Sequence, residues 1–193
     1  MSLFLLLCYN NDAIAMVYYE PGQDRNGAAL SRSGHVRWFY TMYTLDEKFM
    51  LEALKEAEKS ANFDEVPVGA VIVKDGKIIA RGQNLREKTN DPTAHAEIVA
   101  IRKACKKLKS WRLEDCTMYV TVEPCAMCAG TLLWTRIKRI VFGCNDPKGG
   151  AIGSSFELFR VKNINHHPEI TRGVMDFECA KLMQDFFKKK RQK

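Results

Sequence analysis

The sequence predicts an α/β fold, a three-layer α/β/α sandwich with a mixed central sheet. One observation is a hairpin signal, because GAVIV and KIIARG flank Asp75-Gly76, a pair typical of tight hairpin turns. The other is that TMYVTV and RIKRIVFG are apolar runs of strand length with a helical segment between them. Two successive strand–helix units imply parallel pairing through right-handed crossovers. Antiparallel and parallel strands together make a mixed sheet, and the helices cover its faces.

The helices are predicted from their caps and apolar stripes. Thr44-Leu45-Asp46-Glu47 is a capping box, and we expect it to begin the ordered part of the chain. Apolar residues follow it at helical spacing, at Phe49, Met50, Ala53, Leu54, Ala57 and Ala61. A second helix follows the histidine of TAHAE, a third runs from Ala126 to about Thr135, and a final helix carries Met175, Cys179, Leu182, Met183 and Phe186 on one face. These positions predict helices that pack against the sheet.

Length and composition narrow the class of protein. The chain has 193 residues, of which 46% are hydrophobic, which is enough for one domain with a sizeable core. No apolar run approaches the ~20 residues that a membrane span requires. Seven cysteines, an odd number that includes a CxxC pair, fit reduced thiols and a metal better than a secreted disulfide framework. We therefore expect a cytoplasmic protein without a membrane segment.

Residues 1–41 are not expected to belong to the domain. MSLFLLLC has a short apolar run and no basic residue before it, so it is a poor signal peptide. Residues 20–37 are rich in turn formers and lack periodicity, which is typical of a linker or disorder. The sequence thus predicts an appended or disordered leader over residues 1–41 and a zinc-dependent domain over residues 42–193.

Three residues have the types and spacing of zinc ligands: His95, Cys125 and Cys128. A structural zinc site closes all four tetrahedral positions with protein, whereas a catalytic site leaves one open for water. With two thiolate ligands, the zinc-bound water should be less acidic than in a site of three histidines. A neighbouring base is then useful, and Glu97 can be that base. The alternative is a structural zinc knuckle completed by Cys105, Cys116 or Cys144, which leaves Glu97 without a role.

The spacing also restricts where the metal can lie. His95 and Glu97 are two residues apart, and such residues do not face the same way on a regular helix. Both reach a metal only if it lies in front of a helix end, with Thr93 as the expected N-cap. Pro124 suits the start of the next helix, where Cys125 and Cys128 then share the first turn. The zinc is therefore expected between the N-termini of two helices.

HAE followed by PCAMC resembles the HxE…PCxxC signature of the zinc nucleobase deaminases, and the tRNA-specific adenosine deaminases in particular. VPVGAVIV, NDPTAHAEI, RIKRIVFGCNDPKGGA and DFFKKKR extend this resemblance from about Met42 to the C-terminus. It implies a cytidine deaminase-like fold, one zinc ion per subunit and a homodimer. It also implies hydrolytic conversion of adenosine to inosine at the wobble position of an arginine tRNA, with the anticodon stem-loop as partner and Glu97 as the catalytic proton carrier.

The resemblance further implies a set of substrate contacts. Asn84 matches the asparagine that hydrogen-bonds the nucleoside, although a loop asparagine is by default a turn residue. Phe187 is by default a packing residue but could stack on an unpaired base. The remaining expected contacts are Val68, which with Pro67 lines the base pocket, and Ala96, Asp146, Lys148, Asn165 and His166. Two residues depart from the family pattern. Asn145 stands where the family often has a basic residue, and Trp134 stands where a smaller or more polar residue is expected.

The net charge of +7 is concentrated in two clusters. One is the C-terminal run at Lys188, Lys189, Lys190, Arg191 and Lys193, and the other is at Arg102, Lys103, Lys106, Lys107, Lys109 and Arg112. Such clusters are either solvated faces or surfaces for a polyanionic substrate. A deaminase of free guanine or cytosine, or of a nucleoside, would share the zinc core without needing the tail, and a non-catalytic zinc module that binds RNA would not need Glu97.

Overall fold

The computed structural model describes residues 4–9, 13–18 and 40–192. It divides into two compact units, Met1–Lys48 and Phe49–Lys193, which are described separately. Among the described residues, no helix combines the length and the apolar character that crossing a membrane demands.

The first unit contains a three-stranded antiparallel sheet in the order β1-β2-β3, with β1 at Phe4–Tyr9, β2 at Ala13–Tyr18 and β3 at Tyr40–Met42. The sequence analysis did not predict these strands, and the leader expected over residues 1–41 stays a prediction. FLLLCY and AIAMVY are six-residue apolar runs separated by Asn-Asn-Asp. Two such runs three residues apart are typical of a β-hairpin, and the sequence analysis missed this signal. The linker predicted over residues 20–37 lies outside the described residues.

The second unit is built on a five-stranded mixed sheet in the order β5-β4-β6-β7-β8. The strands are β4 Gly69–Lys74, β5 Lys77–Gln83, β6 Cys116–Val122, β7 Arg139–Cys144 and β8 Glu169–Thr171. β4 pairs antiparallel with β5 and β6, whereas β6, β7 and β8 are parallel to one another. Asp75 and Gly76 have φ of 50° and 68°, as a tight type I′ hairpin turn requires. The predicted hairpin and the predicted parallel pair are confirmed.

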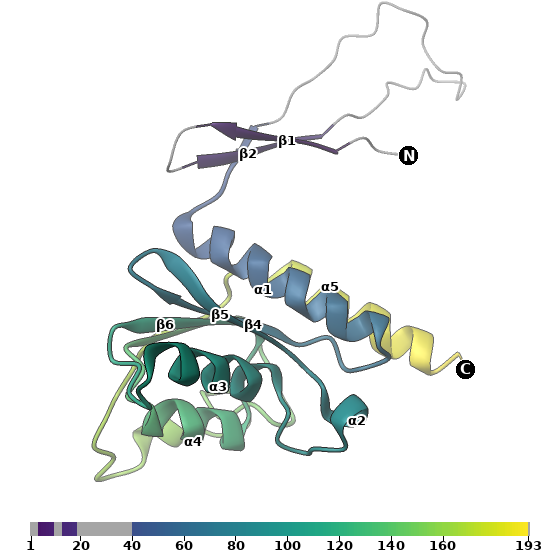
Figure 1. The fold of residues 1–193 in the computed structure, drawn as a ribbon. Helices are drawn as coiled ribbons and strands as arrows, with labels where there is room; N and C mark the ends of the chain where they lie inside the picture. The colour runs from purple at the N-terminus through teal and green to yellow at the C-terminus, as the bar shows by residue number, and fades with distance from the viewer. Residues whose placement is uncertain (1–3, 10–12, 19–39, 193) are drawn as a thin grey trace, which may run out of the picture. The chain divides into compact units, whose positions relative to one another are not determined.

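Helices cover both faces of this sheet (Figure 1). They are α1 Leu45–Asn62, α2 Arg86–Thr89, α3 Ala96–Leu108, α4 Ala126–Trp134, the 3-10 helix η1 Leu158–Arg160 and α5 Asp176–Lys190. α1 and α5 lie side by side on one face, and α3 and α4 lie on the other. Each face has its own apolar core, around Met50 and Val141 under α1 and α5, and around Met118 and Leu132 under α3 and α4. The predicted three-layer arrangement is confirmed.

The capping box at Thr44 is present as predicted. The Glu47 carboxylate accepts hydrogen bonds from the Thr44 N–H at 2.7 Å and from its hydroxyl at 2.9 Å, and the Glu47 N–H donates to Thr44 Oγ1 at 3.2 Å. The sequence analysis missed α2, η1 and β8, because three or four residues are too few to show a helical or strand period.

Candidate active site

His95, Cys125 and Cys128 lie together where the chain enters α3 and α4. One ligand atom from each, a ring nitrogen and two sulfurs, lies within 4.8 Å of the other two. The His95 Nδ1 is 3.7 Å from the Cys125 sulfur and 3.6 Å from the Cys128 sulfur. One imidazole and two thiolates form a donor set that zinc prefers, and three protein ligands are the number typical of a catalytic zinc site. The arrangement is therefore consistent with a zinc site.

Two helix N-termini meet at this group. His95 is the N-cap of α3, with φ −71° and ψ 154°, and Cys125 is the N-cap of α4, with φ −72° and ψ 175°. The prediction of Thr93 as N-cap is thus wrong, because Thr93 instead donates from its N–H and hydroxyl to the Asp91 carboxylate at 2.8 and 2.6 Å. Because His95 precedes the helix, the expectation that residues two apart on a helix face different ways does not apply to His95 and Glu97.

The two sulfurs differ in how readily they ionise. The hydrogen bond from Cys128 and, to a smaller extent, the nearby His95 lower the pKa of Cys125 to about 4 and so favour its thiolate form. The same hydrogen bond raises the pKa of Cys128. One thiolate forms readily, and the second needs a positive charge beside it, which a bound cation supplies. The donor chemistry thus fits a divalent metal.

Glu97 lies in the first turn of α3 and is only 3% exposed. Among the residues that the structure describes, its Oε2 has no hydrogen-bond partner. Burial raises the pKa of this carboxyl. A buried polar atom without a partner is costly and is typical of a site where water, a metal or a substrate completes the bonding. The orphaned oxygen therefore supports a bound group next to His95, Cys125 and Cys128.

A small cavity of about 180 Å³ opens beside these residues. His95, Glu97 and Cys125 line it from the helix ends, and Val68 and Asn84 line it side by side from the open end of the hairpin β4–β5. Ala96 is fully buried at the start of α3. The structure thus brings together the predicted ligands, the predicted base and two predicted substrate contacts.

The amide of Asn84 is held from behind by a buried carboxylate. Its Nδ2 donates to Glu65 Oε2 at 3.4 Å, and Glu65 Oε1 accepts from the Lys88 N–H at 2.8 Å. Glu65 is only 1% exposed. The sequence analysis missed Glu65, although an acid next to VPVG, the segment expected to line the base pocket, was the available signal.

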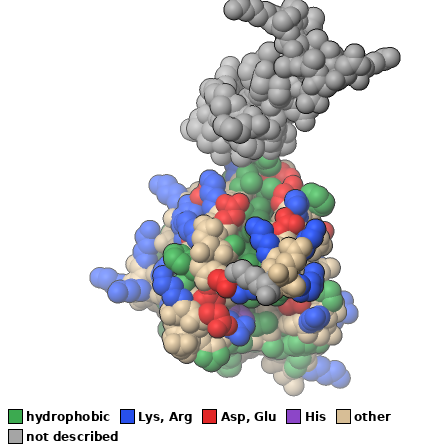
Figure 2. Space-filling view, turned by 90° about the vertical axis from the view of Figure 1, so that its right-hand side faces the viewer, with side chains coloured by type: hydrophobic (Ala, Val, Ile, Leu, Met, Phe, Trp, Pro, Cys, Tyr) green, Lys and Arg blue, Asp and Glu red, His purple; other side chains and the backbone are tan. Residues whose placement is uncertain are grey.

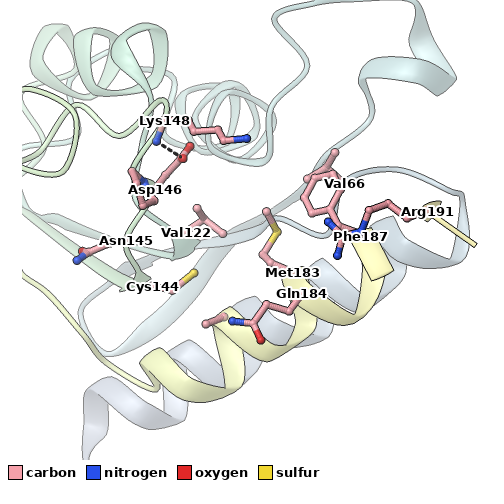
Figure 3. A pocket seen from close by; sticks show the side chains of 12 residues that line it. Val66, Val122, Cys144, Asn145, Asp146, Lys148, Met183, Gln184, Phe187 and Arg191 are labelled. Atoms are coloured by element: carbon pink, nitrogen blue, oxygen red, sulfur yellow. Dashed lines mark hydrogen bonds between the residues drawn. The ribbon is translucent and has the colours of Figure 1, made fainter. Parts of the chain in front are cut away.

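A second, larger cavity of about 670 Å³ shares Val66, Val122, Asp146 and Met183 with the first. Figure 3 shows Asp146 and Lys148, from the loop after β7, across the cavity from Met183 and Phe187 of α5. Its other polar lining residues are Asn145, Gln184 and Arg191. Phe187 is 41% exposed. Asp146, Lys148 and Phe187 therefore lie along one depression that continues from the metal site.

Asn165 and His166 lie elsewhere. They line a third cavity with Arg136 and Lys138, and this cavity of about 520 Å³ shares no lining residue with the other two. Arg136 donates to the Asn165 carbonyl oxygen at 2.8 Å, and the His166 Nε2 is 2.7 Å from the Ile137 carbonyl oxygen. The structure does not bring these two predicted contacts to the metal site.

The cysteines offered as a fourth zinc ligand are also absent from the group. The Cys105 sulfur donates to the Trp111 carbonyl at 3.8 Å, while Cys116 and Cys144 are buried in β6 and β7. Within the described part of the chain, the ligand group contains His95, Cys125 and Cys128 alone. The structural-knuckle alternative is not supported.

Glu123 is a second buried acid that the sequence analysis missed. It is 3% exposed and lines the small cavity. Burial acts to raise its pKa, but hydrogen bonds from Ser154, Ile152 and Asp146 outweigh that effect, so the pKa of Glu123 is lowered. In contrast to Glu97, it is a fully hydrogen-bonded carboxylate.

Basic side chains lie on the face that carries α2 and the C-terminal end of α5 (Figure 2), with acidic side chains between them. Arg86 and Lys88 come from α2, and Lys188–Lys190 end α5. Some of this charge is neutralised, since Lys190 is 2.6 Å from the Asp64 carboxylate. The remaining cations make the face next to the cavities suitable for a polyanion.

Comparison with known proteins identifies the family. Residues 45–191 match the model of the MafB19-like deaminases. The tRNA-specific adenosine deaminase of Bacillus subtilis is 48% identical over 150 residues, which cover 78% of this chain and 93% of that protein.

Two solved structures share the fold. One, from work on A-to-I editing by tRNA:A34 deaminases at the wobble position of transfer RNA, has a TM-score of 0.68 at 45% identity and covers 70% of this chain and 98% of its own. The other, a guanine deaminase from Nitrosomonas europaea, has a TM-score of 0.63 at 25% identity and covers 72% of this chain and 83% of its own. The family model matches residues 45–191, and the Bacillus subtilis relative is 48% identical over 78% of this chain, so the chain belongs to the family of the tRNA-specific adenosine deaminases.

Proposed function

We propose that this protein converts adenosine to inosine at the wobble position of a tRNA, with a zinc ion held by His95, Cys125 and Cys128. The observation that carries the proposal is the buried, unpartnered oxygen of Glu97 beside those three ligands. An acid so placed is ready to exchange protons with water and with a purine. The similarity to tRNA-specific adenosine deaminases supports the choice of substrate.

The overall reaction exchanges the 6-amino group for oxygen, so adenosine and water give inosine and ammonia. Zinc, when bound, supplies the Lewis acidity that lets water ionise near neutral pH. Glu97 accepts the proton of that water and delivers it to the ring nitrogen N1, which makes C6 more electrophilic. The hydroxide adds to C6, and Glu97 then moves the proton of the new hydroxyl group to the 6-amino group, so that the C6–N bond breaks and ammonia leaves as the C6=O bond forms. The N-termini of α3 and α4 stabilise negative charge that develops on oxygen.

The two adjoining cavities suit a base that is turned out of an RNA loop. The small cavity would take the reacting adenine, with Asn84 hydrogen-bonding the nucleoside and Val68 and Ala96 forming its wall. The larger cavity would take neighbouring nucleotides, with Phe187 as a stacking surface and Lys148 near phosphate. Anticodon-loop bases are already unpaired, so little energy is needed to turn one out.

We further propose an arginine tRNA as substrate, a homodimer as the active form and the cytoplasm as the place of action. The side chains of Trp134 and Phe156 are 68% and 46% exposed, and burying them against a second subunit would be favourable. All six cysteines with described side chains are free, which suits a reducing compartment.

The test offers the zinc-containing protein three substrates in parallel: an anticodon stem-loop with adenosine at the wobble position, free guanine and cytidine. Inosine and ammonia are assayed. We expect inosine in the stem-loop and no ammonia from the free compounds. Ammonia from guanine with an unchanged stem-loop would instead favour a nucleobase deaminase, the activity of the Nitrosomonas europaea protein that shares this fold.

A further inference from the structure

We propose that Glu123 is a positioning residue that holds the loop of residues 145–154 and thereby sets how tightly the RNA loop binds. This inference rests on the proposed function for its substrate but not for its structural content. Glu123 stands between the end of β6 and the metal ligand Cys125, and its side chain is 3% exposed. A buried acid in this place could either transfer protons or hold a neighbouring segment. The hydrogen bonds of its two carboxylate oxygens show which role it has.

Both carboxylate oxygens of Glu123 accept hydrogen bonds from the backbone of that one loop. Oε1 accepts the N–H of Ile152 at 2.8 Å and that of Ser154 at 3.1 Å, and Oε2 accepts the N–H of Asp146 at 3.2 Å. Glu97, the proposed proton carrier, instead has an oxygen for which the described residues provide no partner. Glu123 is therefore committed to the loop rather than to proton transfer.

The loop is folded closely around this carboxylate. A Cβ on Gly150 would lie 2.4 Å from the carboxyl carbon of Glu123, so only glycine fits there. The Gly150 N–H donates to the Asp146 carbonyl at 2.9 Å, and the Ala151 N–H donates to the Pro124 carbonyl at 2.9 Å. The position of Asp146 is thus fixed from one side by Glu123 and from the other by Gly150.

The loop forms a wall of both cavities, which gives its position a functional consequence. Asp146 lines the small cavity and the large one, and Lys148 lines the large one. Asp146 Oδ1 accepts the Lys148 N–H at 3.0 Å, which links the two residues to each other (Figure 3). If Asp146 is released, the surface offered to the RNA changes while the side chains of His95, Cys128 and Glu97 stay in place.

Glu123→Gln should release Asp146 selectively. A glutamine has one oxygen and one NH₂ group, and its oxygen can still accept from Ile152 and Ser154. The NH₂ group then faces the Asp146 N–H, donor against donor. The matched control is Glu56→Gln, since Glu56 is also buried, at 5% exposure, but lies on α1 and pairs with Lys59.

The experiment measures inosine formation in an anticodon stem-loop, zinc content, and amide hydrogen exchange of residues 145–154 for the wild type and both variants. For Glu123→Gln we expect full zinc content, faster exchange in that loop, nearly unchanged kcat and a KM raised roughly tenfold, or about 1.4 kcal/mol. Glu56→Gln should change neither KM nor loop exchange. Lost zinc, a fall in kcat at constant KM, or unchanged exchange would overturn the proposal.

Gly150→Ala provides a second route if Glu123→Gln fails to fold, because its methyl group displaces the loop from the other side. It should raise KM and loop exchange in the same way, and failure of both variants to fold would assign Glu123 to stability alone and overturn the proposal. If the wild type makes no inosine, the proposed function fails, and the exchange measurement still decides the positioning role.

Discussion

At the scale of single residues, three buried glutamates show how partners determine what an acid does. Glu65 and Glu123 have both oxygens hydrogen-bonded, the first to Asn84 and the Lys88 N–H and the second to one loop. Glu97 is as deeply buried, but within the described structure its Oε2 has no partner. Satisfied acids fix neighbouring groups, whereas an unsatisfied acid beside metal ligands is available for chemistry.

The buried thiol of Cys179 makes stability depend on alkaline pH. Burial raises the pKa of Cys179 to about 12 from the 9.0 of a free thiol. Above pH 9 the unfolded chain loses a proton that the folded chain keeps, so stability falls as pH rises from 9 towards 12, by up to about 1.4 kcal/mol per pH unit. Cys179→Ala should therefore show a shallower fall in Tm over this range than the wild type. Parallel curves would contradict the assignment.

At the scale of elements, the site is made by two helices that begin at the same place. His95 and Cys125 are both N-caps, so the N-terminal ends of α3 and α4 meet at the His95, Cys125 and Cys128 group. Neither N-cap has a side-chain cap hydrogen bond, because its side chain is turned to the ligand group instead. The metal site therefore takes the place of ordinary helix capping.

The close packing of α3 on β5 should couple stability to activity at Gly82. A Cβ there would lie 2.0 Å from the Ala96 carbonyl oxygen and 2.7 Å from the Ala100 nitrogen. Gly82→Ala must push α3 outwards, which should cost about 1–3 kcal/mol and lower kcat by displacing Glu97. Urea unfolding and inosine formation measure the two effects.

The control for Gly82→Ala is Gly130→Ala in α4, where a Cβ would meet nothing within 4 Å. It should stabilise the protein by about 0.5–1 kcal/mol, since alanine is the better helix former. A Gly82→Ala variant with the stability and kcat of the wild type would contradict the packing account.

Elements with a strong local signal were predictable from the sequence. The hairpin at Asp75-Gly76, the capping box at Thr44 and the crossover between β6 and β7 each depend on a few neighbouring residues, and all are confirmed. The strand β8 has three residues and pairs with β7 across a long loop, so local pattern could not reveal it.

The candidate site was predictable in its ligands but not in its surroundings. His95, Cys125 and Cys128 follow from residue type and spacing, and the structure brings them together. Glu65 and Glu123 act through backbone N–H groups that lie far away in sequence, and a sequence does not show which carboxylate those groups reach. Thr93 was a reasonable N-cap by residue type, but His95 is the N-cap, and the Thr93 hydroxyl donates to Asp91 instead.

At the scale of the whole molecule, all the residues proposed for catalysis and binding belong to the unit Phe49–Lys193. We therefore expect that a chain without residues 1–41 retains its zinc content and its kcat/KM, because it keeps Thr44, which caps α1, and the entire site. Zinc content and inosine formation of the shortened chain test this. A well-folded shortened chain without activity would show that residues 1–41 contribute to the enzyme.

The C-terminal cations should make RNA binding depend on salt. Lys188 and Lys189 lie next to Phe187, which lines the larger cavity, so replacing both with alanine should reduce the slope of log Kd against log salt by about 0.7 for each lost phosphate contact. Replacing Lys106 and Lys107 of α3, which line none of the three cavities described above, should leave the slope unchanged. Equal effects of the two pairs would instead indicate unspecific attraction.

The role of Glu97 is tested most directly by Glu97→Gln, assayed for inosine in an anticodon stem-loop together with its zinc content. Glutamine has nearly the same shape, so the variant should keep the metal and a Tm at least as high as that of the wild type. It should lose about 10²–10⁴-fold in kcat, because the amide cannot carry the proton. A variant that still forms inosine at the wild-type rate would contradict the assignment of Glu97 as the proton carrier, and with it the proposed mechanism.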